Sequence, residues 1–262
     1  MINATAEASL PKDRIAFCQN RQTQPALQRL IRSPANLMPM QNTGGMFGLK
    51  TGVCWWHSRL QRRLTYLAHF KPELKKPTGN EVLKLLHKIK RGNKIVIIPG
   101  FKNLQEFGKA YPKTIQRSLD DWMAGDSLLR QTWVKGLVGR KHMAADDLKA
   151  YLNKMYVEFK ESKGIPVQIL NFKGITAHSW ILVDMFKNKD GDYVLEILDS
   201  NKPTSTIRFI PETTTMNPAS LYDANDSDYK HPLFGYDEFI SKTHFRPEQR
   251  KLQRAVANYC SN

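Results

Sequence analysis

The spacing of apolar residues changes along the chain, from helical periods in its first two thirds to strand-like runs in its last third. Between Cys54 and Phe70 apolar residues recur every three or four positions, which predicts a helix whose first turn carries Cys54. Four further segments are predicted to be helical: 25–31, 78–92, 144–164 and 245–259. In the second of these, Asn80 is a candidate N-cap and Gly92 a helix stop. Residues 102–142 are predicted to be helical in pieces, broken by Pro112 and by glycines.

The predicted strands are short apolar runs, most of them near the C-terminus. They cover 94–100, 167–174, 178–188, 192–201 and 206–210. The sequence KDGD at 189–192 predicts a hairpin turn between two of them. An order of helices first and antiparallel strands afterwards indicates an α+β fold in one domain. We expect this domain to span 51–262, with a helical insert around 100–142, and to follow a polar, mostly loop-like segment, 1–50, that could cover a cleft.

The charge balance is strongly basic, because 40 lysines and arginines against 24 acids give a net charge of +16. Such a balance favours acidic partners or anionic surfaces. Nucleic acid is not a favoured partner, because the chain has no helix-turn-helix turn, RNP-like strand or zinc-finger spacing. No apolar run approaches the roughly 18 residues of a membrane span. The first residues do not resemble a signal peptide, so the protein is expected to be made without one or to begin after its removal.

The chain has three cysteines, Cys18, Cys54 and Cys260. An odd count in a secreted chain indicates one disulfide and one free thiol, and the two terminal cysteines are the natural pair. That pairing would imply an oxidising compartment, such as the outside of the cell or a periplasm. The alternative is a cytosolic protein with three reduced cysteines.

Cys54 is the first candidate for chemistry. A thiol at a helix N-terminus feels the positive end of the helix dipole, which favours the reactive thiolate. A single cysteine is, however, more often a small buried hydrophobe. Later in the same helix, His57 is interpreted as a surface or boundary residue. Arg59, Arg62 and Arg63 are interpreted as a solvated face, or alternatively as a cleft rim that attracts acidic substrates. Of the adjacent tryptophans 55 and 56, one is expected to anchor the helix and the other to line a cleft.

Two further candidates lie in the predicted sheet. His178 begins a strand, which would hold an imidazole rigidly enough for general-base catalysis, although a core or edge histidine is the simpler interpretation of it alone. Asp199 ends the strand that the hairpin folds back beside His178, and an acid there could fix the histidine tautomer. Asn201 is an alternative orienting residue, and Asp184 is a weaker one because it lies mid-strand. The simpler interpretation of Asp199 alone is a turn residue at the end of a strand, a position that aspartate often occupies.

Together these residues form the order nucleophile, base and orienting acid that thiol catalysis requires. The motifs GVCWWHS, AHSW and ILDSN, with the helix-then-sheet layout, resemble the papain-like cysteine peptidases. The resemblance implies a papain-like fold, with Cys54 as nucleophile, His178 as base and Asp199 or Asn201 as orienting residue. The transglutaminase-like enzymes share the same order and suit HSW and ILDSN about as well.

The chain departs from the papain-like pattern before the cysteine, where that family commonly has a glutamine in the oxyanion hole. Gly48 and its neighbours occupy this place, so Gln41 further upstream is the candidate, with the backbone N–H of Cys54 as the alternative donor. The expected activity is hydrolysis of a peptide or amide bond through a thioester, by a cysteine protease or amidase that needs no metal or organic cofactor. The alternatives are acyl transfer to an amine and a non-catalytic binding module. The expected substrate is a protein or peptide-like molecule, which the basic surface would favour if it is acidic.

Overall fold

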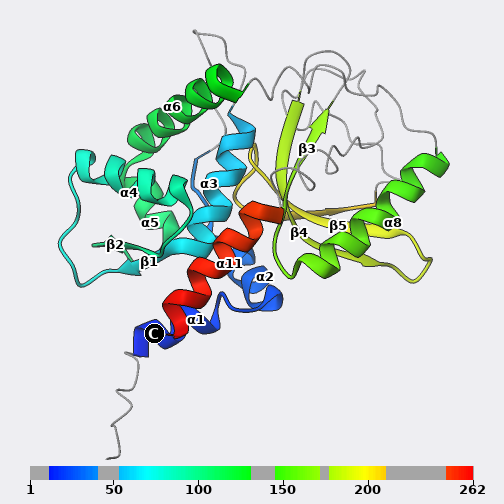
Figure 1. The fold of residues 1–262 in the computed structure, drawn as a ribbon, viewed down its shortest axis with the longest axis horizontal. Coiled ribbons are helices and arrows are strands. Elements are labelled where there is room, and N and C mark those ends of the chain that lie inside the picture. The colour runs from blue at the N-terminus through cyan, green and yellow to red at the C-terminus, as the bar shows by residue number, and fades with distance from the viewer. Residues whose placement is uncertain (1–11, 41–52, 131–144, 172–176, 211–245, 262) are drawn as a thin grey trace, which may run out of the picture.

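The structure is a computed structural model that describes residues 12–40, 53–130, 145–171, 177–210 and 246–261 (Figure 1). Within these ranges the helices are α1 (Lys12–Gln19), α2 (Gln24–Arg32), α3 (Cys54–Leu67), α4 (Gly79–Arg91), α5 (Leu104–Ala110), α6 (Pro112–Arg130), α8 (Ala145–Ser162) and α11 (Arg246–Ser261). A short 3₁₀ helix, η1 (Pro34–Asn36), follows α2.

The described strands form two sheets. Strands β3 (Val167–Asn171), β4 (Ala177–Lys187), β5 (Tyr193–Asp199) and β6 (Thr206–Phe209) make an antiparallel sheet in chain order. Strands β1 (Ala68–Lys71) and β2 (Val96–Pro99) make a small parallel pair. The predicted helical segments, the sheet and the hairpin at KDGD are therefore present in the described residues, and the fold is α+β.

The antiparallel sheet is covered on both faces, because alternate residues of a strand point to opposite sides. On β4, Ile181 and Val183 belong to the larger core cluster, which also contains residues of α3. Trp180 and Leu182 belong to a second cluster with one face of α8. Helix α3 is the central element, lying between the sheet and the α4–α6 helices, with α11 across it (Figure 1).

The N-terminal segment is less loop-like than predicted. Its described part contains α1 and α2, and Leu27 and Ile31 of α2 are fully buried in the larger core. Helix α1 has no clear amphipathic pattern, which is why the sequence did not reveal it. Residues 1–11 and 41–52 lie outside the described ranges, and whether the segment covers a cleft stays a prediction.

The predicted helix over 54–70 is too long by three residues. It ends at Leu67, and the next four residues form β1, in which Ala68 pairs with Val96 of β2. The buried Arg21 side chain donates hydrogen bonds to the carbonyls of Thr65 at 2.8 Å and Ala68 at 3.2 Å, so it satisfies the end of the helix. The helical spacing predicts that the helix continues to Phe70. The strand pairing with β2 and the hydrogen bonds from Arg21, both made by residues distant in sequence, end it at Leu67 instead.

The predicted N-cap of α4 is wrong, whereas its predicted stop is right. The cap is Thr78, which forms a capping box with Glu81, and Asn80 lies inside the first turn. Gly92 ends the helix in the left-handed conformation, with φ of 70°.

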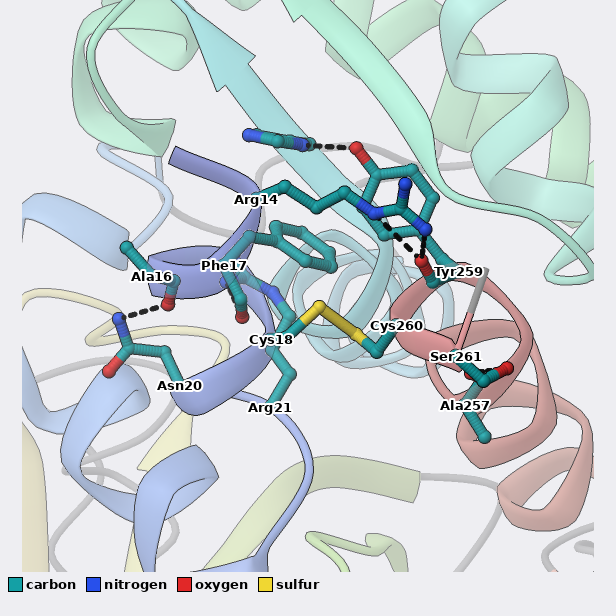
Figure 2. The surroundings of a disulfide bond; sticks show 11 residues. Arg14, Ala16, Phe17, Cys18, Asn20, Arg21, Ala257, Tyr259, Cys260 and Ser261 are labelled. Carbon is teal, nitrogen blue, oxygen red and sulfur yellow. Dashed lines mark hydrogen bonds between the residues drawn. A yellow bond between two sulfur atoms is a disulfide. The ribbon is translucent and has the colours of Figure 1, made fainter. Parts of the chain in front are cut away.

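A disulfide between Cys18 and Cys260 joins α1 to α11 (Figure 2). Around it, Arg14 donates from Nε to the carbonyl of Tyr259 at 2.9 Å, and its guanidinium lies over the Tyr259 ring. Phe17 stacks on His69, whose Nδ1 lies 2.9 Å from the Tyr259 hydroxyl. The disulfide therefore joins two helices within a packed aromatic cluster, through cysteines that are 242 residues apart in sequence.

Candidate functional site

Cys54 is the first residue of α3, and it is the free cysteine of the chain. The helix begins with a hydrogen bond from the N–H of His57 to the carbonyl of Val53, at 2.8 Å. The thiol is therefore at the positive end of a 14-residue helix, and that helix has no acidic residue in its first turn. The residue is partly exposed to solvent.

Serine side chains attach this end of α3 to the sheet. Ser179 of β4 donates from its hydroxyl to the carbonyl of Cys54 at 3.1 Å. In return, Ser58 of α3 donates to the carbonyl of Ser179 at 3.2 Å, and Ser200 donates to the same carbonyl at 3.2 Å. These contacts fix the first turn of α3 against the strand that carries His178. No sequence pattern distinguishes these serines, although Ser179 adjoins His178 and Ser58 lies four residues after Cys54.

His178 and Asp199 lie beside each other in the sheet. Asp199 pairs with Trp180 across β4 and β5, and His178 is two residues from Trp180 on the same face. The Nε2 atom of His178 lies 2.9 Å from each carboxylate oxygen of Asp199, and both side chains are fully buried. The contact is therefore an ion pair as well as a hydrogen bond whenever the ring is protonated.

The alternative orienting residues have other contacts. The backbone N–H of Asn201 donates to Oδ1 of Asp199 at 2.7 Å, which steadies the carboxylate. Asp184 lies 3.1 Å from Arg32 of α2, and Arg32 also contacts Glu196. Asp199 is thus the residue whose carboxylate contacts His178.

The surroundings of His178 favour its protonated form. Burial alone would lower its pKa, but the charge and hydrogen bond of Asp199 and a side-chain hydrogen bond to Cys54 raise the pKa to about 10. The imidazole therefore interacts with both the carboxylate and the thiol, and its Nε2 atom is bonded to the carboxylate. At neutral pH this arrangement holds a positive ring beside the sulfur, which is the partner that a thiolate needs.

His57 is buried next to this pair, so its interpretation as a surface or boundary residue is wrong. Its Nε2–H donates to the carbonyl of Met40 at 2.9 Å. Burial lowers its pKa to about 4, against smaller opposing effects of the Met40 hydrogen bond and the Asp199 charge. His57 is thus neutral at pH 7. Its place three residues after Cys54, on a neighbouring part of the helix surface, was a signal available in the sequence.

The three arginines of α3 are also buried, which contradicts the prediction of a solvated face. Arg59, Arg62 and Arg63 converge on the carboxylate of Glu248 from α11. Their charges hold the pKa of Glu248 far below its usual value, although burial alone would raise it. Arg59 also contacts Asp126 of α6 at 3.2 Å. No local pattern reveals this cluster, because Glu248 is 185 residues from Arg63.

Both tryptophans after Cys54 are partly buried and pack against the larger core, and the expectation that one of them lines a cleft stays a prediction. Trp56 donates from its indole to Asp126 at 3.1 Å, and Arg59 lies over the ring of Trp55. Gln41, the candidate oxyanion donor, lies outside the described residues. Its neighbour Met40 is described, and the contact with His57 brings the chain to the first turn of α3 immediately before Gln41.

Within the described ranges, His, Cys, Asp and Glu side chains form no group of three or more suited to a metal ion. The helices described there also include none that is long and apolar enough to cross a membrane. Comparison of the chain with protein-family models finds no matching family, and searches among curated proteins and solved structures find no significant match.

Proposed function

We propose that the protein is a thiol-dependent hydrolase, a cysteine protease or amidase, that cleaves a peptide or amide bond through a thioester. The observation that carries the proposal is the position of His178, with Nε2 on the Asp199 carboxylate and a hydrogen bond to the thiol that begins α3. A structural thiol needs no charged imidazole beside it, and a buried aspartate–histidine pair aimed at a thiol is the arrangement that activates a nucleophile.

In the proposed reaction, the Cys54 thiolate attacks the carbonyl carbon of the scissile amide and forms a tetrahedral oxyanion. Because Nε2 of His178 is bonded to Asp199, Nδ1 is the ring nitrogen that gives its proton to the departing amine. Water then attacks the thioester while His178 takes up a proton, and loss of the thiolate releases the acid. Backbone N–H groups in the first turn of α3 are suited to stabilise the oxyanion, with Gln41 as the side-chain candidate.

The order of the three residues and the contact of a central helix with a sheet support a papain-like fold as the framework of this site. The Cys18–Cys260 disulfide supports a secreted or periplasmic protein, because such bonds persist in oxidising compartments. The net charge of +16 supports an acidic protein or peptide as substrate.

Cleavage profiling tests the proposal. A peptide library of varied sequence is incubated with the wild-type protein and analysed by mass spectrometry for new termini. We expect cleavage by the wild type, none by Cys54→Ala or His178→Ala, and full activity for His87→Ala, a matched change at an exposed histidine of α4. Cleavage that persists in Cys54→Ala would contradict the proposal.

The same assay separates hydrolysis from acyl transfer. Addition of a fluorescent primary amine offers a competitor to water at the thioester. Products that end in a free carboxylate indicate a hydrolase, whereas stable incorporation of the amine into glutamine-containing peptides indicates a transglutaminase-like transferase. A protein that binds peptides through this site but forms neither product would be the binding module.

A further inference from the structure

A hollow lined by cationic side chains lies on the outer face of α11. Its volume is ≈ 380 Å³, and its polar lining consists of Asn93, Arg250, Lys251, Arg254 and Asn258. Asn93 comes from the turn after α4, so two separate parts of the chain form the walls. We call this feature the α11 hollow.

The packing of α11 leaves this face of the helix to solvent. Residues 250, 254 and 258 are four apart and therefore share one side of the helix, and all are exposed. The opposite side carries Leu252 and Val256, which are buried in the larger core. The basic residues of the hollow thus contribute nothing to the core and are free to face a ligand.

The charges around the α11 hollow have one sign. No aspartate or glutamate lines it. Across the described ranges, no ion pair involves Arg250, Lys251 or Arg254, whereas the three arginines of α3 share Glu248 of α11. Arg91 and Lys94, which lie within two residues of Asn93 in sequence, are exposed as well. Like charges held together in this way repel one another and create a strong positive potential that an anion would relieve.

The chemistry and the size of the hollow indicate the kind of anion. Arginine guanidinium groups match phosphate in a two-pronged geometry, and lysine and amide groups supply further donors. A volume of ≈ 380 Å³ lies within the roughly 300–1,000 Å³ of small-ligand sites, larger than one phosphate requires and too small for a folded partner.

We propose that the α11 hollow is a binding site for a ligand that carries two or more phosphate groups close together. The ligand would contact Arg250 and Arg254 from one side and Asn93 from the other. This site is distinct from the Cys54 site and does not depend on its chemistry. A soluble polyphosphorylated molecule and a phosphorylated lipid headgroup share the required chemistry.

Calorimetric titration with inorganic tripolyphosphate tests the site, using the full chain with its disulfide intact. We expect saturable binding to the wild type that weakens as salt is added. Arg250→Glu/Arg254→Glu should lower the affinity roughly tenfold or more, because two charge-assisted contacts become repulsions. Arg250→Gln/Arg254→Gln removes the charges without adding new ones and should give a smaller loss in the same direction.

The matched control is Lys113→Glu/Arg117→Glu on α6, which alters two exposed cations with the same spacing. Either Glu double variant lowers the net charge from +16 to +12, by two units for each of two residues. Retained affinity in the control supports the α11 hollow. An equal loss in both variants, or no binding of tripolyphosphate by the wild type, overturns the proposal.

Two further measurements complete the test. The variant Cys54→Ala should bind tripolyphosphate like the wild type, so a failure of the proposed hydrolase activity would leave this result unaffected. Flotation with vesicles that contain a phosphoinositide identifies the source of the ligand. Vesicle binding that Arg250→Glu/Arg254→Glu abolishes indicates a lipid headgroup, whereas tripolyphosphate binding without vesicle binding indicates a soluble ligand.

Discussion

Replacement of Glu248 by glutamine removes the negative charge on which three buried arginines converge. Glu248 accepts hydrogen bonds from Arg63 Nε at 2.7 Å and from Arg59 at 3.4 Å, and it pairs with Arg62. The arginine side chains are 9%, 1% and 8% exposed for Arg59, Arg62 and Arg63, so water cannot take the place of the carboxylate. Glutamine keeps the shape and one acceptor oxygen, which isolates the effect of the charge.

The expected loss of stability is large. Removal of one partner from a buried ion pair costs about 3–5 kcal/mol, because the remaining charge stays buried. For a chain of this size each kcal/mol corresponds to roughly 2–4 °C in the melting temperature. Glu248→Gln should therefore lower the melting temperature by roughly 6–20 °C. Glu73→Gln is the matched control, because Glu73 is 60% exposed and lies 3.8 Å from Lys71, and such surface pairs contribute at most about 1 kcal/mol.

Thermal unfolding followed by circular dichroism at pH 7 measures both changes. The pH dependence gives a second readout, because the pKa of Glu248 is lowered in the folded state. The stability it contributes is present above the unfolded value near 4.5 and declines as the pH falls below it, so the wild type should lose more stability in acid than Glu248→Gln. Equal melting temperatures for Glu248→Gln and Glu73→Gln would refute the assignment of a buried, charge-dependent cluster.

Three further predictions follow from the site and from the disulfide. Asp199→Asn should lower the pKa of His178 below its value of about 10, because only the interactions with Cys54 then oppose the effect of burial; the shift is measurable by NMR of labelled histidine, and an unchanged pKa would contradict the ion pair. Cys18→Ser/Cys260→Ser should lower the free energy of unfolding, measured with urea, by about 2–4 kcal/mol. Equal stability of the variant and the wild type would show that the disulfide does not stabilise the fold. His57 has a pKa of about 4 in the folded state and about 6.5 in the unfolded state, so the stability that its neutral form contributes above pH 6.5 is lost as the pH falls to 4. His57→Gln should flatten this part of a plot of unfolding free energy against pH. An unaltered plot would argue against a buried neutral imidazole.

Elements with a strong local pattern could be predicted from the sequence. One example is the α4 helix, which has apolar residues at helical spacing on one face and ends at Gly92. Another is the hairpin around Gly191. The positions of Cys54, His178 and Asp199 also followed from local rules, because a helix start and the two arms of a hairpin fix where each residue lies. Hairpin register then places His178 and Asp199 at the same end of the sheet.

Features that depend on distant partners could not be predicted. Arginines at 59, 62 and 63 have the composition of a solvated face, and only the approach of Glu248 makes their burial favourable. The helix over 54–67 ends where β2 offers Ala68 a strand partner, which helical spacing cannot reveal. The serine hydrogen bonds around Ser179 could not be predicted either, because serines do not recur at a spacing that indicates a contact.

The pH dependence of alkylation at Cys54 tests whether this cysteine is a thiolate beside a protonated His178. The other two cysteines are joined in the disulfide, so iodoacetamide has one free thiol to modify. At pH 6 an ordinary thiol, with a pKa of about 8.5, is only about one part in 300 thiolate. We expect rapid modification of the wild type and of His87→Ala at pH 6. Modification of His178→Ala should be slow at pH 6 and become faster towards pH 8.5. Slow modification of the wild type at pH 6, with no effect of His178→Ala, would contradict a thiolate–imidazolium pair at this site.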